Sequence, residues 1–144
     1  MHTLSYPAKL SPESKGAFTV MFPDLPEAIT CGANLDDAVH QAADCLACAL
    51  GGRMADGMEI PRPSRSGRNQ RLIQVPLYLA LKVALYMAMR ESKVNSSQLA
   101  RKLGVSETVV RRMLNPRRHS KPERMEAALE ALGKRIQLMV EDAA

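Results

Sequence analysis

The chain has 144 residues, of which 46% are apolar and 3% aromatic, and it carries a net charge of +5. This length fits one domain or two small ones, and the apolar share is enough for a core of aliphatic side chains. The longest apolar run, 75–89, contains Lys82 and is too short to cross a membrane, so it predicts a core helix.

The N-terminus and the cysteines indicate where the protein acts. The first ten residues lack a basic region followed by an apolar one, so we see no secretory signal. The cysteines number three and lack the spacing of a disulfide framework, which favours a reducing compartment. We therefore expect a cytoplasmic protein.

Short β-prone runs and one helix are predicted in the first part of the chain. We expect four strands, at 3–10, 17–22, 28–32 and 72–75. From Asn34 the apolar residues recur at helical spacing, and the glycine pair 51–52 is expected to stop the helix. A polar loop with four arginines, residues 62–71, precedes the last strand. The predicted order is β-β-β-α-β.

The rest of the chain is predicted to be helical. Pro76 suits the first turn of a helix that runs to about Ser92. The apolar run RIQLMV, 135–140, could form a short C-terminal strand. We therefore expect an α+β fold with a domain boundary near Val75, giving domains 1–75 and 76–144.

Charge is divided unevenly between the two parts. Residues 1–60 carry three basic and eight acidic residues, a net charge of −5. Residues 61–144 carry 17 basic and seven acidic residues, a net charge of +10. This polarity indicates an acidic part for a basic partner and a basic part for a polyanion. An uneven surface charge without any partner is the alternative.

Residues 95–115, NSSQLARKLGVSETVVRRMLN, have the pattern of a helix-turn-helix. Gly104 can adopt the positive φ of the turn, Val105 fills the corner between the helices, and Ser106 is a natural N-cap for the second helix. The inward side chains are expected to be Leu99, Ala100, Leu103, Val110 and Leu114. An ordinary helical hairpin is the alternative.

The second helix of this motif would place its N-terminal residues against base edges in the major groove. Arg111 or Arg112 could pair bidentately with guanine, and Thr108 offers a hydroxyl or methyl contact. Basic residues beyond the helix would contact phosphates, unless they form only a solvated loop. The predicted DNA contacts are Ser106, Glu107, Thr108, Val109, Arg111, Arg112, Asn115, Arg117, Arg118 and Lys121.

One such motif reads only a few base pairs, so specific binding normally requires a dimer. The helix at 76–92 is rich in leucine, alanine and methionine and could contribute to the interface. The run 135–140 could pair with its counterpart across a two-fold axis, or it could pack within its own domain. The sequence leaves both arrangements open.

Metal and cofactor sites are not expected. Cys45 and Cys48 have the spacing of a metal or redox pair, but they lie within a helix, and no second pair matches. Small thiols that fill space on a helix are the favoured interpretation. The chain also lacks a glycine-rich phosphate loop and a nucleophile elbow.

Acidic residues cluster in residues 22–39, which raises the possibility of a two-metal nuclease. Such chemistry needs carboxylates that converge from different elements. Neither the first nor the fourth strand has one, and Asp36 and Asp37 fall in a first helical turn capped by Asn34, where they stabilise the helix dipole. Only Asp24 and Glu27 remain, on one turn. We therefore expect no enzyme activity.

Taken together, the two parts resemble the HicB antitoxins of bacterial type II toxin–antitoxin systems. The resemblance rests on YPAKL, on GAFTVMFPDLPEAITCGANLDDAVHQAADCL with its PDLPE segment (residues 23–27), and on RLIQVPLYLALKV. It covers nearly the whole chain. Some members of the family end in a ribbon-helix-helix, whereas this chain resembles the helix-turn-helix branch.

The resemblance implies a partial ribonuclease H-like N-terminal domain without nuclease acids. This domain would bind HicA, a small basic mRNA-cleaving toxin, and cover its catalytic histidine, while the C-terminal domain would dimerise and repress the operon. The candidate toxin contacts are Phe22, Asp24, Leu25, Pro26 and Glu27. The arginine-rich loop 62–71 departs from the family pattern. The alternative function is a stand-alone helix-turn-helix repressor with a small-ligand sensor domain.

Overall fold

The structure is a computed structural model that describes residues 3–143. The α+β class expected from the sequence is confirmed: an antiparallel sheet with one helix is followed by a run of helices. The chain divides into two compact units, residues 1–83 and 84–144, and the division falls within α2. Among the described residues, no helix is both long and apolar enough to cross a membrane.

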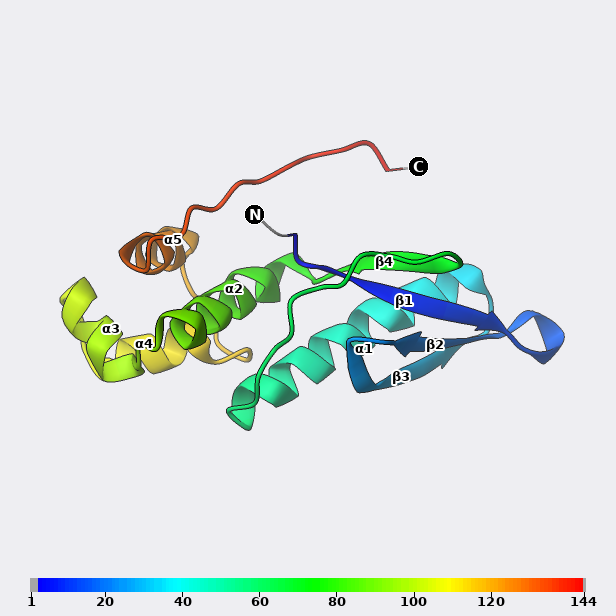
Figure 1. Cartoon of the computed structure of the whole chain (residues 1–144), viewed down its shortest axis with the longest axis horizontal. Helices are drawn as coiled ribbons and strands as arrows, with labels where there is room; N and C mark the ends of the chain where they lie inside the picture. The colour runs from blue at the N-terminus through cyan, green and yellow to red at the C-terminus, as the bar shows by residue number, and fades with distance from the viewer. Residues whose placement is uncertain (1–2, 144) are drawn as a thin grey trace. The chain divides into compact units, whose positions relative to one another are not determined.

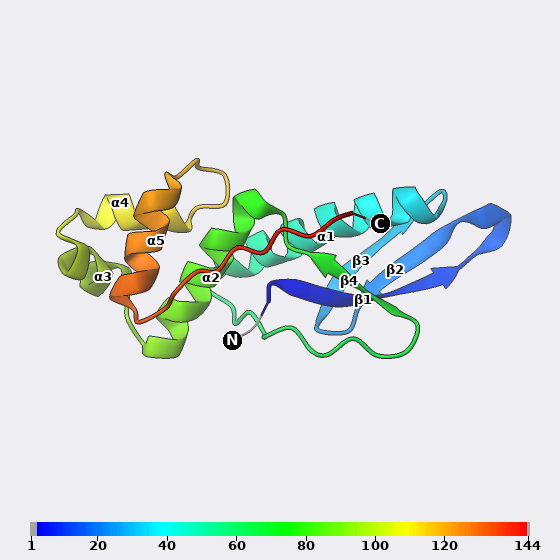
Figure 2. The same ribbon diagram turned by 90° about the horizontal axis from the view of Figure 1, so that it is seen from above.

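The N-terminal unit has the predicted β-β-β-α-β order. Its elements are β1 (Ser5–Pro12), a 3-10 turn η1 (Ser14–Gly16), β2 (Phe18–Phe22), β3 (Leu25–Gly32), α1 (Leu35–Ala55), β4 (Gln70–Gln74) and the start of α2 (Leu77–Ser92). The strands pair antiparallel in the order β3-β2-β1-β4. Helix α1 lies along one face of this sheet (Figures 1 and 2).

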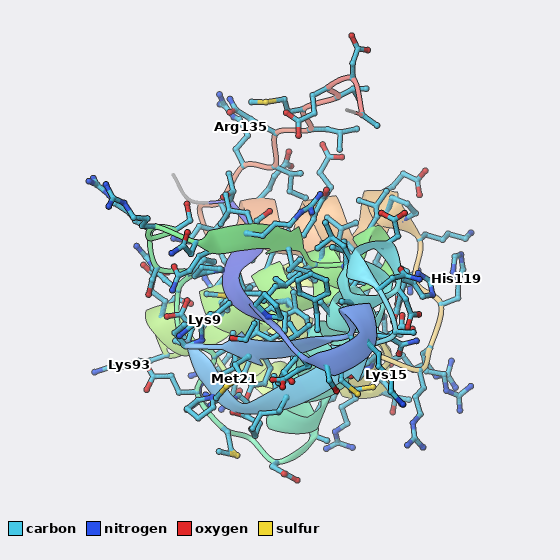
Figure 3. All side chains as sticks on the ribbon, turned by 90° about the vertical axis from the view of Figure 1, so that its right-hand side faces the viewer. Lys9, Lys15, Met21, Lys93, His119 and Arg135 are labelled. Carbon is cyan, nitrogen blue, oxygen red and sulfur yellow. The ribbon has the colours of Figure 1, made fainter. Side chains whose placement is uncertain are left out.

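Alternation along the strands separates a buried face from an exposed one. Tyr6, opposite Ile73 in the register, and Val20 are buried. Lys9 and Met21 lie directly opposite each other on β1 and β2 and are exposed (Figure 3). Aliphatic side chains of α1 complete the core, as the aliphatic composition predicted: Ala38, Ala42, Leu46, Leu50 and Met54.

The sheet and the helix meet most closely at Gly32, the last residue of β3. A Cβ atom at this position would lie 2.3 Å from the backbone nitrogen of Ala38. Only glycine therefore allows this approach between the strand end and the first turn of α1.

Helix α1 continues past the glycine pair 51–52, where the sequence led us to expect its end. It runs to Ala55 and ends before Gly57, which has a φ of 66°. Each glycine costs about 1 kcal/mol in a helix interior. Burial of Leu50 and Met54 against the sheet offsets this cost, so tertiary packing overrides the local stop signal.

The third strand begins earlier than predicted, at Leu25 instead of residue 28. Phe22 pairs with Leu25, so only Pro23 and Asp24 remain as a two-residue hairpin loop. Pro26 therefore lies inside β3. Because β3 is an edge strand, a residue without a backbone N–H is tolerated there.

The segment between α1 and β4 is fastened to the sheet although it forms no helix or strand. The hydroxyl of Tyr6 donates a 2.7 Å hydrogen bond to the carbonyl of Pro61, and Ile60 is buried. Burial raises the pKa of Tyr6 well above its usual range, with the negative charge of Asp24 as a second cause. The residues immediately before the arginine-rich loop 62–71 are therefore anchored to the sheet.

The C-terminal unit is helical. After α2 come α3 (Ser96–Leu103), α4 (Glu107–Leu114) and α5 (Pro122–Ala131). Of the side chains expected to point inward, Leu99, Ala100 and Val110 are buried. Leu103 and Leu114 are only half-buried, and Met113 takes the place of Leu114 in the core. Residues three and four positions after Val110 lie near the same helix face, so the 3.6-residue period alone did not separate them.

No helix or strand follows α5 in the described residues. The sequence suggested a possible strand at 135–140, but these residues form no strand and do not pack as one within their own domain. Leu138, Met139 and Val140 are 76%, 85% and 88% exposed. The other option, pairing with a second copy, stays a prediction.

Candidate functional site

Helix α3 begins with a complete capping box. The side chain of Asn95 accepts a 2.8 Å hydrogen bond from the backbone N–H of Gln98. In return, the side-chain oxygen of Gln98 accepts a 2.9 Å bond from the N–H of Asn95. Two of the N–H groups left without a partner at the helix start are thereby satisfied, which fixes where the first helix of the motif begins.

The turn between α3 and α4 has the predicted geometry. Gly104 adopts a left-handed conformation with φ 66° and ψ 32°, and its N–H donates back to the carbonyls of Ala100 and Arg101. Ser106 caps α4 by accepting a 3.4 Å hydrogen bond from the N–H of Val109. These two roles, turn glycine and N-cap, were both read correctly from the sequence.

The outer face of α4 is polar and cationic. Thr108, Arg111 and Arg112 are exposed, whereas Val109 is half-buried and less available for a contact. A guanidinium nitrogen of Arg111 lies 2.6 Å from a carboxylate oxygen of Glu107, one turn earlier. Such exposed pairs contribute only about 0.3–0.5 kcal/mol, so Arg111 can exchange this partner for a nucleic-acid base at little cost.

The basic loop after α4 has local order. The side chain of Asn115 accepts a 3.0 Å hydrogen bond from the N–H of Arg117, and its carbonyl accepts one from the N–H of Arg118. Arg117, Arg118 and Lys121 are exposed. The structure therefore presents a cationic loop next to the cationic face of α4, which is an arrangement suited to a phosphate backbone.

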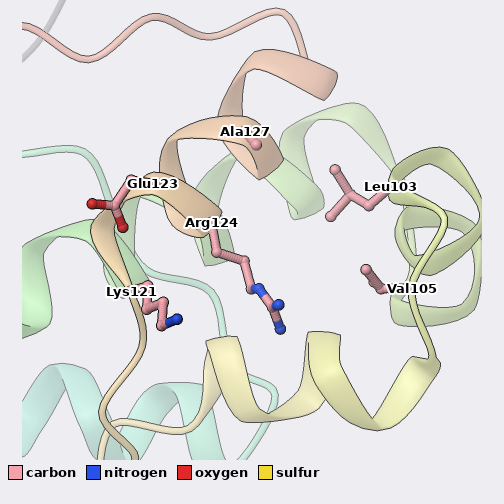
Figure 4. Close-up of a pocket in the computed structure, with 6 residues that line it drawn as sticks. All are labelled: Leu103, Val105, Lys121, Glu123, Arg124 and Ala127. Carbon is pink, nitrogen blue, oxygen red and sulfur yellow. The ribbon is translucent and has the colours of Figure 1, made fainter.

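A shallow depression of about 390 Å³ lies between the α3–α4 turn and the start of α5 (Figure 4). Val105, predicted to fill the corner between the helices, is half-buried and lines this depression. The other lining residues are Leu103, Lys121, Glu123, Arg124 and Ala127. The corner of the motif is thus only partly filled.

The PDLPE segment does not present all of its residues to solvent. Phe22 and Leu25 are 2% and 0% exposed and belong to the core of the N-terminal unit. Pro26 and Glu27 are exposed, and Asp24 is half-buried. Of the five candidate toxin contacts, only these three side chains can touch a partner while the hairpin keeps this fold.

Asp24 fastens the arginine-rich loop to the hairpin. One of its carboxylate oxygens accepts a 2.9 Å hydrogen bond from the backbone N–H of Ser64, and the other accepts a bond from the hydroxyl of Ser64. Sequence reasoning missed Ser64, because the two residues are 40 positions apart and a serine in a polar loop carries no local signal.

Glu27 forms a bidentate ion pair with Arg53 on α1. Two guanidinium nitrogens lie 2.6 Å and 2.9 Å from its two carboxylate oxygens. The hydrogen bonds from Arg53 lower the pKa of the Glu27 carboxyl. Asp24 and Glu27, the two acids left as candidates for a nuclease site, therefore each have a partner within the chain. Asp24 contacts loop 62–71, whereas Glu27 contacts α1.

The remaining acids and thiols are not grouped for metal binding. Asn34 caps α1 as predicted, because its side chain accepts a 2.9 Å hydrogen bond from the N–H of Asp37. The carboxylate of Asp37 in turn accepts a 2.8 Å hydrogen bond from the N–H of Ala33. Burial raises the pKa of the Cys45 thiol, and neighbouring Cys48 adds to this effect. Within residues 3–143, no three His, Cys, Asp or Glu side chains are placed to hold a metal ion together.

Comparison with known proteins identifies the family. Residues 5–84 match the family model of the HicB-like antitoxin of bacterial toxin–antitoxin systems. The antitoxin HicB of Escherichia coli strain K12 is 34% identical over 137 residues, which cover 95% of this chain and 99% of the relative. Antitoxin HicB 2 of Photorhabdus laumondii is 35% identical over 136 residues, covering 94% of this chain and 96% of that protein. The antitoxin HicB of Pseudomonas fluorescens is 34% identical over 132 residues.

These similarities extend over both units, from the sheet to the helix-turn-helix. The family model ends at residue 84, close to the division between the units, and the relatives align across nearly the entire chain. The chain therefore belongs to the HicB family of antitoxins.

Proposed function

We propose that this protein is a cytoplasmic antitoxin and autorepressor that acts by binding and has no catalytic activity. Its N-terminal domain, 1–75, binds and neutralises a small mRNA-cleaving toxin of the HicA type. Its C-terminal domain, 76–144, represses its own operon by binding operator DNA as a homodimer or a dimer of dimers. Membership of the HicB family supports the toxin partner.

The observation that carries the DNA-binding part is the fully capped α3–Gly104–α4 unit. A recognition helix must be held at a fixed angle and must present side chains that read bases. The capping box at Asn95 and the N-cap at Ser106 support the first requirement. Exposed Arg111 and Arg112, with the cationic loop that follows, support the second.

The toxin contact is proposed at the exposed part of the PDLPE segment. Asp24, Pro26 and Glu27 would contact the toxin. The buried side chains of Phe22 and Leu25 would anchor the hairpin in the core. Because Asp24 and Glu27 already have partners on loop 62–71 and on α1, the hairpin is held rigid. A rigid surface loses less conformational entropy when it binds.

The test of the DNA-binding part uses Arg111→Ala and Arg112→Ala, with Lys15→Ala as a control that removes one positive charge from the other domain. Loss of a bidentate base contact is expected to weaken binding to DNA upstream of the operon by about ten- to a hundred-fold. Each variant should still form a complex with the toxin. Unchanged operator binding in both arginine variants would contradict the proposal.

The toxin-binding part needs two substitutions at one position, because Asp24 also holds the loop. Asp24→Asn keeps an acceptor for Ser64 and should retain most toxin binding. Asp24→Lys places a positive charge against a basic partner and should release the toxin, with operator binding retained. Toxin binding by the lysine variant at wild-type affinity would exclude this segment as the contact.

A further inference from the structure

The arginine-rich loop 62–71 carries positive charge that is unpaired within the chain. Arg65, Arg68 and Arg71 follow one another at intervals of three residues, and residues 60–90 contain no acidic residue. The three side chains are exposed. Within residues 3–143, none of the three guanidinium groups forms a hydrogen bond or an ion pair. They are therefore accessible to a partner outside the chain.

The acids of the adjoining PDLPE segment do not neutralise these arginines. Both carboxylate oxygens of Asp24 accept hydrogen bonds from Ser64, one from the backbone N–H and one from the hydroxyl. The carboxylate of Glu27 is paired with Arg53 on α1. The hairpin thus positions the loop through a serine and leaves the charge of its arginines uncompensated.

The loop is held in shape at both ends. The contact between Asp24 and Ser64 fixes its first part. Its last part is a turn in which the N–H of Gly67 donates a 2.6 Å hydrogen bond to the side-chain oxygen of Gln70, and the N–H of Gln70 donates back to the carbonyl of Gly67. Asn69 adopts a left-handed conformation with a φ of 63°, which asparagine tolerates. Figure 2 shows this turn as the green bend that leads into β4. A fixed loop loses less conformational entropy when it binds.

The chemistry of the loop suits a phosphate backbone. Guanidinium groups are planar and form paired hydrogen bonds with phosphate oxygens. Proteins that bind single-stranded nucleic acid also stack the bases on aromatic side chains. The loop and β4 contain no aromatic residue, since none lies between Phe22 and Tyr78. Closely spaced arginines without a stacking platform favour the backbone of a duplex over single-stranded RNA.

The same chain can bring a duplex to this loop. Residues 72–94 join it to the helix-turn-helix, and only Val75 and Pro76 separate β4 from α2. A site tethered to a molecule that is already bound experiences an effective concentration on the order of millimolar. Phosphate contacts that are too weak to hold free DNA therefore still add to the affinity of the whole chain.

We propose that Arg65, Arg68 and Arg71 form a second DNA site on the N-terminal unit, which binds the phosphate backbone of duplex beside the operator. The proposal rests on the proposed function, because the helix-turn-helix supplies the DNA. Phosphate contacts carry no sequence information, so this site adds affinity and salt dependence without reading bases.

The test replaces the three arginines together by glutamine in the full-length chain (Arg65→Gln, Arg68→Gln and Arg71→Gln). The control is Lys9→Gln with Lys15→Gln, which removes two exposed charges from the same unit outside the loop. Binding to an operator with flanking duplex is measured over a range of salt concentrations. The loop variant should bind about ten-fold or more weakly at low salt. The slope of log affinity against log salt should fall by about three for each bound chain. The control should keep the wild-type slope.

A second measurement separates the loop from the helix-turn-helix. A chain with Arg111→Ala and Arg112→Ala should retain weak, salt-sensitive binding to duplex of unrelated sequence. Adding the three loop substitutions should weaken this binding further. Single-stranded RNA of the same length is the competitor and should displace the duplex poorly. Toxin binding, measured on the same samples, should equal that of the wild type, which shows that the N-terminal unit is folded.

Three results would overturn the proposal: a loop variant with the affinity and salt slope of the wild type, a loss no larger than that of the lysine control, or RNA that binds the loop more tightly than duplex does. If the wild type binds its operator and the loop substitutions have no effect, the second site is wrong and the proposed function stands. If no operator is bound, but the loop substitutions weaken binding to unrelated duplex, the DNA-binding part of the proposed function is wrong and the loop site stands.

Discussion

Arg53 connects three parts of the N-terminal unit through one side chain. Its guanidinium contacts both carboxylate oxygens of Glu27 on β3, and a further nitrogen donates a 2.8 Å hydrogen bond to the carbonyl of Glu59. The planar group matches a carboxylate in a way that lysine cannot. Arg53 thus holds the edge strand and the start of the 56–69 segment against the end of α1.

The Glu27–Arg53 pair predicts a dependence of stability on pH. The hydrogen bonds from Arg53 place the pKa of Glu27 in the folded chain below its ordinary value of 4.5. The stabilising contribution is therefore present above about pH 4.5 and is lost as the pH falls through the lowered pKa. At neutral pH, Glu27→Gln should destabilise by about 1 kcal/mol or less, because the pair is partly exposed.

Thermal unfolding at pH 7 and at pH 3 measures this effect. The difference between Glu27→Gln and the wild type should shrink at the lower pH. Glu126→Gln, an exposed change on α5, is the control and should unfold like the wild type. A difference that is equally large at both pH values would show that the glutamine disturbs packing and not charge.

The long-range partners of single side chains could not be predicted from the sequence. The acidic residues of the PDLPE segment were visible, but the residues that engage them lie 26 and 40 positions away. By contrast, Asn34 and Ser106 act within their own helix turns, and their capping roles were predicted correctly. A side chain's role could be predicted where its partner is local.

At the scale of elements, two glycines in the β3–α1 unit have opposite consequences. Gly32 lies where strand and helix touch, and an added Cβ would meet the backbone of Ala38. Gly52 lies in α1, where an added Cβ would have no atom within 4 Å beyond its chain neighbours and the backbone of its own helix. One glycine is required by packing, whereas the other only weakens its helix.

Alanine substitutions at these two glycines should therefore change stability in opposite directions. Gly32→Ala should destabilise the N-terminal unit by about 1–3 kcal/mol or more, because the strand end must move away from α1. Gly52→Ala should stabilise it by about 0.5–1 kcal/mol. Chemical denaturation measures both free energies of unfolding. A lower free energy of unfolding for Gly52→Ala would contradict the claim that a side chain fits at this position. An unchanged free energy of unfolding for Gly32→Ala would contradict the close contact between β3 and α1.

The elements themselves were largely predictable, and the helix-turn-helix most of all. Its caps and turn depend on residues close in sequence, so the pattern at 95–115 contains them. The inner face was predicted only in part, because Met113 is buried where Leu114 was expected. The end of α1 was not predictable, because burial of Leu50 and Met54 extends the helix through two glycines. The course of loop 62–71 was not predictable either, because its contact with Asp24 is long-range.

At the scale of the whole molecule, charge is distributed differently in the fold than along the sequence. The four arginines of loop 62–71 belong to the N-terminal unit, so eight basic and eight acidic residues cancel within 1–83. The entire net charge of +5 lies in residues 84–144. Under the proposed function, attraction of a basic toxin would have to come from a local acidic surface, whereas the net charge of the C-terminal unit would favour its binding to DNA.

The central claim is that one chain neutralises a toxin with its N-terminal domain while its C-terminal domain binds DNA. The most direct measurement is mRNA cleavage by the purified cognate toxin, titrated with the wild-type chain and with a chain carrying both Arg111→Ala and Arg112→Ala. We predict that both chains abolish cleavage at equal stoichiometry and that only the wild type binds the operator. Cleavage that continues in an excess of the wild-type chain would contradict the account.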